Sequence, residues 1–332
     1  MEIAVVGSGG WGTALARLLS KNGHDVTLWS FLKEEAENLA KTRENPLLRG
    51  VILPDEVRCT SDPACVKGKK LVVLASPSFA TRPTSELIRP YLEPDAVIVS
   101  VAKGIEAGTS MRLSEIVESV TGRTVVVLCG PSHAEEVGRD IPTGCVAACR
   151  EVGIAETVQD IFMNDNFRVY AGTDVVGIEL GAALKNVIAL CAGICDGMGY
   201  GDNTKALLMT RGLTEIARLG MAMGSRQETF TGLAGVGDLI VTCCSMHSRN
   251  RRAGILIGQG KDPQAAMKEV GSVVEGYYAA KSAHELSEKM HVEMPISREA
   301  YRILYEGGDP REAMRDLMTR RKCHEFEDAG WQ

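Results

Sequence analysis

Residues 3–16, IAVVGSGGWGTALA, decide the fold. An apolar run ends at the pattern G-x-G-x-x-G, formed by Gly7, Gly9 and Gly12, and a helical pattern follows it. The six-residue pattern alone is weak evidence, but a second apolar run at Asp25–Trp29 has the spacing of a βαβ unit. Gly7 permits the tight turn, Gly9 lets the backbone approach a pyrophosphate, and Gly12 allows close helix packing. The sequence therefore predicts a dinucleotide site at the start of the chain.

Strand-like and helical patterns alternate through the first half of the chain. Strands that are rich in Val, Ile and Leu throughout and are separated by helices indicate a parallel sheet covered on both faces. Right-handed crossovers then give a doubly wound, Rossmann-like domain. The expected strands are residues 2–6, 25–29, 70–76, 96–102 and 124–129, with two short additions near 144–148 and 167–170. The expected helices are residues 13–21, 33–41, 78–88 and 111–120.

After about Asp174 the strand-like runs nearly vanish and helical periodicity takes over. The expected helices here are residues 177–192, 204–221, 249–258, 275–288 and 311–318. We therefore expect an α/β protein with an N-terminal doubly wound Rossmann-like domain, residues 1–174. An all-α C-terminal domain, residues 175–332, would bind the substrate and carry out catalysis.

Composition limits the possible functions. The 332 residues suit two domains, and a net charge of -6 gives no electrostatic reason to bind nucleic acid or a membrane surface. The chain starts directly with an apolar strand, so we expect no targeting segment. Residues 175–198 are apolar but contain Glu179, Lys185, Asn186 and Asp196, which argues against membrane insertion.

The ten cysteines are expected to be reduced, as in a cytoplasmic protein. Two pairs, Cys145/Cys149 and Cys191/Cys195, have helical spacing, but no CxxC partner or His pair accompanies them. We interpret the cysteines as small core residues and expect no metal site.

The choice of nucleotide depends on the residues after the second strand. NAD enzymes normally carry a carboxylate there, which binds the ribose 2′-hydroxyl. In this sequence Ser30 and Phe31 stand at that point and Lys33 follows, so a 2′-phosphate would meet a lysine. NADP is slightly favoured, use of both nucleotides stays open, and Lys33 is equally well explained as a solvated helix residue.

Two polar segments follow predicted strands of the sheet. Lys103, in VAKGIE, lies just past the fourth strand, at the edge where ligands bind in open α/β sheets. Gly130 and Ser132, in GPSHAEEV, follow the next strand. Their backbone amides and the serine hydroxyl are candidates for lining a pocket.

Two further segments belong to the helical half. Lys185 interrupts a long apolar helix, so it either extends to solvent or takes a buried role with a partner, for which Asp238 is the candidate. Ser248 is the expected N-cap of a helix that starts near Arg249. A helix start with an arginine is a good anion site, because Arg binds phosphate oxygens bidentately. A solvated basic helix start is the alternative.

Together these segments resemble the bacterial NAD(P)-dependent glycerol-3-phosphate dehydrogenases. The resemblance runs from Ile3 to about Leu304, in the family's order and approximate spacing, through GSGGWGTALA, VAKGIE, GPSHAEEV, ELGAALKNVIAL, TFTGLAGVGDLIVTC, HSRNRRAG and VVEGYYAA. It implies reversible reduction of dihydroxyacetone phosphate to sn-glycerol 3-phosphate with NAD(P)H, for glycerophospholipid synthesis, by a cytoplasmic homodimer.

The resemblance also implies roles for single residues. Lys185 would be the general acid/base, and Asp238 would belong with it in the active site. Both match substrate positions, as do Lys103, Gly130, Ser132, Ser248, Arg249 and Asn250. The matching dinucleotide positions are Gly10, Trp11, Lys103, Ala134, Arg249, Val273 and Glu275, which join Gly7, Gly9, Gly12 and Lys33. The family usually has Ser at position 10, so this chain would lose a hydroxyl contact there.

Two alternatives stay open at this point. A β-hydroxyacid dehydrogenase or ketopantoate reductase has the same two-domain plan but acts on carboxylates, whereas the HSRN segment and Lys103 favour a phosphate. A non-catalytic dinucleotide-binding regulator would not need the pair Lys185 and Asp238.

Overall fold

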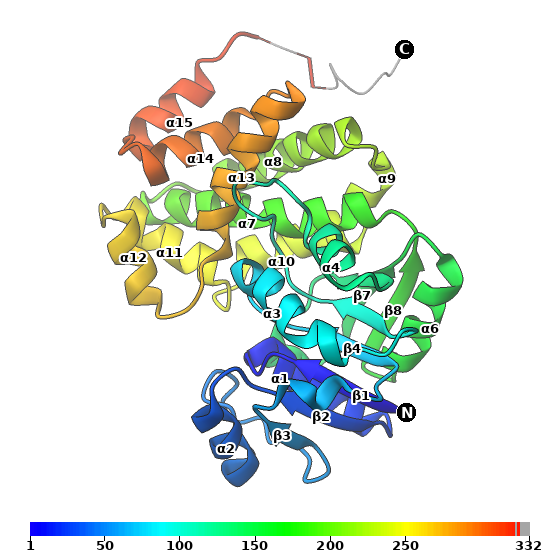
Figure 1. Cartoon of the computed structure of the whole chain (residues 1–332). Helices are drawn as coiled ribbons and strands as arrows, with labels where there is room; N and C mark the ends of the chain where they lie inside the picture. Colours follow the sequence, from blue (N-terminus) through cyan, green and yellow to red (C-terminus); the bar gives the residue numbers. More distant parts are fainter. Residues whose placement is uncertain (323, 326–332) are drawn as a thin grey trace.

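Eight strands of the N-terminal half form one sheet. The computed structural model describes residues 1–322, 324 and 325, and the strand order is β3-β2-β1-β4-β5-β6-β7-β8 (Figure 1). The strands are β1 (Glu2–Val6), β2 (Asp25–Trp29), β3 (Arg58–Thr60), β4 (Leu71–Leu74), β5 (Val97–Ser100), β6 (Val125–Cys129), β7 (Thr143–Ala148) and β8 (Phe167–Gly172). Each predicted strand is present to within two residues at either end.

The sheet differs from the expected one in two details. Strand β3 was not predicted, because Arg58-Cys59-Thr60 is a short edge strand without an apolar run. Strand β7 pairs antiparallel with β6, whereas every other pair of neighbouring strands, β7 with β8 included, is parallel. A parallel partner needs a long crossover, usually a helix, but only the one-turn helix α5 (Ala134–Val137) separates β6 from β7. The chain therefore turns back and runs the other way.

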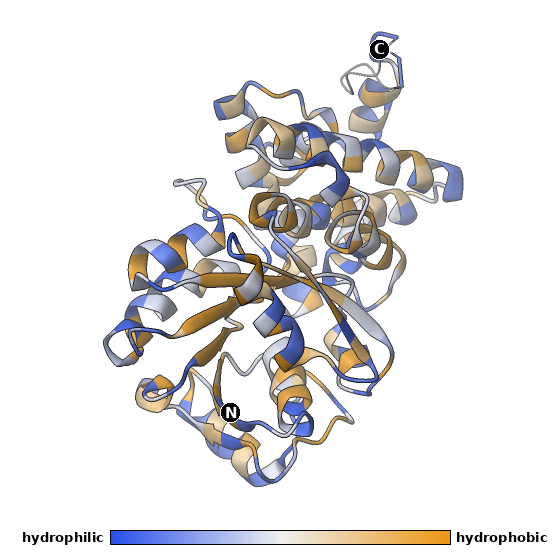
Figure 2. Cartoon of the chain, turned by 90° about the vertical axis from the view of Figure 1, so that its right-hand side faces the viewer, coloured by the Kyte–Doolittle hydropathy of each residue, from blue (hydrophilic) through white to orange (hydrophobic). Residues whose placement is uncertain are grey.

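Helices cover both faces of this sheet, as a doubly wound fold requires. Alternate residues of β1 point to opposite faces: Ile3 and Val5 pack in one apolar cluster with α1, and Ala4 and Val6 in another that includes Val117 of α4. Figure 2 shows the strands as hydrophobic and the outer helices as mixed. The helices are α1 (Gly10–Lys21), α2 (Lys33–Thr42), α3 (Thr81–Ile88), α4 (Leu113–Thr121) and α6 (Val152–Phe162), with short 3-10 turns η1 (Pro63–Val66), η2 (Ser78–Ala80) and η3 (Arg89–Tyr91).

From residue 175 the described chain is helical and stacks on one end of the sheet (Figure 1). The elements are α7 (Val175–Gly197), α8 (Asp202–Ala222), α9 (Gln227–Phe230), η4 (Leu233–Gly237), α10 (Asp238–Cys244), α11 (Arg249–Gly258), α12 (Pro263–Val270), α13 (Glu275–Met290), α14 (Pro295–Tyr305) and α15 (Pro310–Met318). All five expected helices are present, and α9, α10, α12 and α14 were not predicted. The expected domain division falls between β8 and α7 and remains a proposal; residues 323 and 326–332 lie outside the described part.

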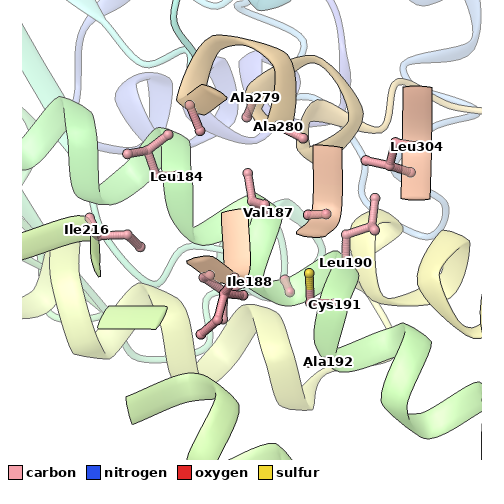
Figure 3. Close-up of a cluster of buried hydrophobic side chains, with 14 of the residues drawn as sticks. Leu184, Val187, Ile188, Leu190, Cys191, Ala192, Ile216, Ala279, Ala280 and Leu304 are labelled. Atoms are coloured by element: carbon pink, nitrogen blue, oxygen red, sulfur yellow. The ribbon is translucent and has the colours of Figure 1, made fainter. Parts of the chain in front are cut away.

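Helix α7 is the centre of the helical half. It is long and apolar enough to cross a membrane, as is one bent pair formed by residues 227–244 with 249–258, but 89% of the most apolar window of α7 is buried in the protein. Figure 3 shows Leu184, Val187 and Ile188 of α7 surrounded by side chains of α8, α13 and α14. Burial on all sides explains why this helix is apolar all round.

Helices α7 and α11 touch through their backbones. A Cβ atom at Gly193 would lie 2.1 Å from the carbonyl oxygen of Arg251, and one at Gly254 would lie 2.0 Å from that of Leu190. Gly197 and Gly258 are equally confined. Side chains would force the helices apart, so glycine at these positions sets how close the two helices lie.

A buried carboxylate holds the start of α14. Glu215 of α8 is 3% exposed and accepts hydrogen bonds from the backbone N–H groups of Ile296 (2.7 Å) and Ser297 (3.2 Å). Burial raises the pKa of Glu215 to about 7, although these hydrogen bonds act to lower it. This carboxyl group therefore titrates near neutral pH.

Candidate active site

The glycine-rich turn has the shape of a pyrophosphate cradle. Gly7 has a φ of +122°, and a Cβ there would meet the carbonyl oxygen of Ala75 at 2.6 Å. A Cβ at Gly12 would lie 1.9 Å from the carbonyl oxygen of Gly7, whereas one at Gly9 would meet nothing within 4 Å. At Gly7 and Gly12 any side chain would clash with the backbone of the protein. At Gly9 the space beside the backbone is open, so a ligand can approach it. These residues fit a dinucleotide.

Helix α1 begins at Gly10, three residues earlier than expected, because the last residues of the glycine-rich turn form the first turn of the helix. Gly9 is the N-cap and provides no side-chain cap, so the N–H groups of the first turn point out of the helix toward the open side of Gly9. A Cβ at Gly10 would lie 3.1 Å from the carbonyl oxygen of Leu47 and 3.8 Å from Cβ of Ala134. Glycine therefore suits this position, where the family usually has Ser. Trp11 is half-buried against the sheet core.

A carboxylate lies at the end of β2, where none was expected. The Ser30 hydroxyl donates a 2.8 Å hydrogen bond to Oε2 of Glu35, and the Ser8 hydroxyl donates to the same oxygen at 3.4 Å. The side chain of Lys33 is 78% exposed and its ammonium lies 3.6 Å from Glu37. Glu35 was not predicted from the sequence, because it belongs to the first turn of α2 and does not directly follow the strand.

Lys185 is buried beside Asp238, and this pairing was expected. Lys185 and Asp238 are 4% and 1% exposed, and Nζ of Lys185 donates a 2.6 Å hydrogen bond to Oδ1 of Asp238. A second bond, 2.5 Å long, runs to the hydroxyl oxygen of Thr242, one turn further along α10. Thr242 was not predicted; its i+4 spacing from Asp238 is the signal that would have found it. The ammonium keeps one proton without a partner among the described residues.

Lys103 completes the cluster from the other half of the chain. Its Nζ donates to Oδ2 of Asp238 at 2.8 Å and to the carbonyl oxygen of Gly130 at 3.1 Å. One carboxylate thus joins two lysines, one from the sheet edge and one from α7. The sequence predicted Lys103 and Asp238 separately but not this contact, because 135 positions separate them in the chain.

Burial and neighbouring charges shift the pKa values of the three groups in this cluster in different directions. Burial lowers the pKa of Lys185 to about 8; the charge of Asp238 opposes this effect, and that of Lys103 adds to it. For Lys103 burial is the largest effect and acts to lower the pKa. The charge and hydrogen bond of Asp238, together with Cys129 and Cys145, outweigh it, and the pKa is raised. Burial would raise the pKa of Asp238, yet the two lysines lower it. The pKa shifts of Lys103 and Asp238 therefore favour their charged forms, whereas burial brings the pKa of Lys185 to about 8.

The backbone places these side chains. A Cβ at Gly181 of α7 would lie 2.7 Å from the carbonyl oxygen of Ala234, so α7 and η4 are in close contact just before α10 begins. Gly130 is confined in the same way, since a Cβ there would lie 2.8 Å from the carbonyl oxygen of Gly144. The Ser132 hydroxyl donates to the carbonyl oxygen of Gly130 at 3.0 Å and so lies next to Lys103.

The start of α11 lies on the other side of this centre. Ser248 is the N-cap, as predicted, and its buried hydroxyl oxygen accepts from the N–H of Arg251 at 3.2 Å. Arg249, the first residue of the helix, is exposed. The rings of His247 and His133 lie 5.8 Å apart, which brings this segment beside the loop after β6. The N–H groups of the first turn and Arg249 together can hold an anion.

Asn250 has a different environment from Arg249. Its amide nitrogen donates to Oδ1 of Asn186 at 2.9 Å, and its oxygen accepts from the N–H of Gly276 at 2.8 Å. These bonds join α7, α11 and α13. Asn250 therefore holds α7 in place next to Lys185. Its partner Asn186 was not predicted from the sequence.

Glu275 connects the helical half to the sheet edge. The hydroxyl of Ser78, in η2, donates to Oε2 of Glu275 at 2.6 Å, and its N–H donates to Oε1 at 3.3 Å. Burial raises the pKa of Glu275 although these bonds and the charge of Arg249 oppose it. Val273 is half-buried just before α13. Lys103, Asp238 and Glu275 therefore make contacts that join the two halves, whereas Lys33 lies on the exposed side of α2.

Among the described residues, no group of three or more His, Cys, Asp or Glu side chains is arranged to hold a metal ion. One half of the chain has a glycine-rich turn that fits a dinucleotide, and the other half has a buried lysine with a lowered pKa and a helix start that could accept an anion. This fold and site define a two-domain dehydrogenase that depends on a nicotinamide dinucleotide.

Comparison with known proteins names the family. The N-terminal model of the NAD-dependent glycerol-3-phosphate dehydrogenases matches residues 2–155, and the C-terminal model matches residues 174–315. Glycerol-3-phosphate dehydrogenase [NAD(P)+] of Thermoanaerobacter sp. is 54% identical over 98% of this chain and 99% of its own length. The crystal structure of glycerol-3-phosphate dehydrogenase from Coxiella burnetii is 36% identical, with a TM-score of 0.93, and covers 96% of this chain and 99% of that one.

The chain belongs to the NAD-dependent glycerol-3-phosphate dehydrogenase family. It is an oxidoreductase that uses NAD(P), which confirms the family, the kind of enzyme and the cofactor that the sequence predicted. A ketopantoate reductase from Ralstonia eutropha has a TM-score of 0.62 and 15% identity, over 95% of this chain and all of its own. That likeness is one of fold alone. Membership of the glycerol-3-phosphate dehydrogenase family sets aside the β-hydroxyacid and ketopantoate alternatives and the non-catalytic regulator.

Proposed function

We propose that this chain catalyses the reversible reduction of dihydroxyacetone phosphate to sn-glycerol 3-phosphate with NAD(P)H, and that Lys185 is its general acid/base. The observation that carries the proposal is the buried Lys185 ammonium, held by Asp238 at 2.6 Å, with its pKa lowered to about 8. An acid that must protonate an alkoxide in one direction and accept a proton in the other works best with a pKa near the working pH.

Each residue of the site has a proposed part in this reaction. The bound nicotinamide supplies the hydride. The first turn of α11 and Arg249 hold the substrate phosphate. Lys185 directs its remaining proton at the carbonyl oxygen and gives it up as negative charge develops there. Asp238 orients that ammonium, and Lys103 keeps Asp238 ionised and adds a positive charge beside the reacting oxygen.

The cofactor and substrate positions implied by the resemblance are proposed as well. The turn formed by Gly7, Gly9 and Gly12 holds the pyrophosphate, with Gly10, Trp11 and Ala134 beside it. Ser132 and the backbone at Gly130 line the substrate pocket, while Val273 and Glu275 close the cofactor side from α13. We further propose a cytoplasmic homodimer whose product enters glycerophospholipid synthesis; light scattering of the purified chain tests the dimer.

The decisive test is turnover in the Lys185→Ala variant. We expect NAD(P)H oxidation with dihydroxyacetone phosphate to be nearly abolished while NAD(P)H binding persists. Lys281→Ala, which removes an exposed lysine of α13, is the matched control and keeps wild-type turnover. Turnover of Lys185→Ala close to that of the wild type would exclude the proposed role. Faster oxidation with ketopantoate or a β-keto acid than with the triose phosphate would refute the substrate.

A further inference from the structure

Glu35 occupies the space between the end of β2 and the glycine-rich turn. Its Oε2 accepts hydrogen bonds from Ser30, which directly follows β2, at 2.8 Å, and from Ser8, inside the turn, at 3.4 Å. Ser30 is 1% exposed, so its hydroxyl is a fixed support for the carboxylate. Oε1 of Glu35 has no hydrogen-bond partner among the described residues. One oxygen is therefore anchored, and the other is free to accept a bond from a ligand.

This location is where a bound dinucleotide places its adenosine ribose. In Rossmann domains the pyrophosphate lies at the first glycine turn and the ribose beside the end of the second strand, where a carboxylate accepts from the 2′-hydroxyl. Figure 1 shows α2 next to β2 and β3, at the end of the molecule away from the helical half. Leu32, the N-cap of α2, has an extended backbone, and the first turn that follows brings Glu35 back over the strand end. The position in the first turn also favours a negative charge.

Three basic side chains of residues 33–58 have partners on the protein. Lys33 lies 3.6 Å from Glu37 on the exposed side of α2. Arg43 donates to the carbonyl oxygen of Val57 at 2.9 Å, and Arg58 pairs with Asp25 at 2.8 Å. The 2′-phosphate of NADP carries about two negative charges at neutral pH and would meet the carboxylate of Glu35 first. The ribose of NAD brings a hydroxyl donor instead.

We propose that Glu35 binds the adenosine ribose 2′-hydroxyl and makes this chain selective for NAD(H) over NADP(H). This assignment reverses the slight preference for NADP that Lys33 suggested. It rests on the proposed function only in that the dinucleotide must bind at the glycine-rich turn. No step of the reaction depends on it.

The test measures binding of NADH and NADPH to the whole chain without substrate, by the change in nicotinamide fluorescence. We expect the wild type to bind NADH at least about tenfold more tightly, which is about 1.4 kcal/mol. Glu35→Gln keeps the size of the side chain and removes its charge, so NADPH binding should tighten and the ratio should narrow by about tenfold. Glu34→Gln, an exposed carboxylate in the same helical turn, is the matched control and leaves the ratio unchanged.

Two results would overturn the proposal. One is a wild-type chain that binds NADPH as tightly as NADH, and the other is a Glu35→Gln ratio equal to that of the wild type. The binding measurement uses no ketone substrate. The preference for NADH can therefore be observed even if the proposed reaction does not take place. Conversely, normal turnover with equal affinity for both nucleotides would refute only the role of Glu35. The carboxylate is exposed, so its replacement leaves the fold in place for the measurement.

Discussion

Replacing Asp238 with asparagine should shift the pH at which the enzyme loses its reductive activity. The Lys185 pKa of about 8 is set by burial, which lowers it, and by the Asp238 charge, whose oxygen lies 2.6 Å away and raises it. Removing one partner of a buried ion pair costs about 3 kcal/mol, and about 1.4 kcal/mol corresponds to one pKa unit. Asp238→Asn should therefore lower the pKa of Lys185 by about two units.

The effect on rate follows from the fraction of Lys185 that carries a proton. Near pH 7 that fraction falls from about nine-tenths to about one-tenth, so ketone reduction should slow about tenfold. The assay is kcat for dihydroxyacetone phosphate reduction between about pH 5 and about pH 9, at saturating substrate and cofactor. The wild-type rate should decline near pH 8 and the variant rate near pH 6.

Cofactor affinity and the melting temperature control for a general loss of structure, since asparagine has nearly the size of aspartate. The reasoning would be refuted if kcat of the variant declined at the same pH as kcat of the wild type and was only lower at every pH. In that case the proton-donating group is not the lysine whose pKa Asp238 raises.

Three other changes test separate parts of the structure. Arg249→Ala should raise KM for the triose phosphate by roughly 10- to 100-fold with a smaller effect on kcat, because charge-assisted bonds to the phosphate are lost; an unchanged KM would place the phosphate elsewhere. Burial raises the pKa of Glu215 from its ordinary value of 4.5 to about 7, so the stability linked to its protonated form is lost as pH rises between these two values. Between about pH 5 and about pH 8, urea unfolding of the wild type should lose roughly 3 kcal/mol more than that of Glu215→Gln, and equal losses would contradict this. Gly254→Ala places a Cβ 2.0 Å from the Leu190 carbonyl oxygen and should cost about 1–3 kcal/mol of stability, while Gly153→Ala, whose Cβ meets nothing within 4 Å, should cost nothing.

Local patterns were enough to predict most of the fold. Apolar runs locate the long strands, and capping chemistry locates α11, which begins at Arg249 after Ser248 as expected. The missed elements are those whose cause is not local. Strand β3 is held by pairing with β2, and the direction of β7 depends on how little chain separates it from β6.

The site shows the same division. Lys185 and Asp238 stand out in sequence because a charge in an apolar helix needs a partner. Glu35 does not stand out, since it looks like any other glutamate on an exposed helix until the fold brings it beside Ser30. Thr242 and Asn186 are likewise ordinary polar residues whose roles come from their neighbours in space.

The glycine contact between α7 and α11 also limits how far apart Lys185 and Arg249 can lie. Lys185 is carried by α7 and Arg249 begins α11, so the spacing of these two residues depends on the backbone contact at Gly193 and Gly254. Side-chain repacking in the surrounding core cannot easily change that distance. If Lys185 and Arg249 hold the two ends of the substrate as proposed, the length of substrate that fits would depend on the spacing of these two helices.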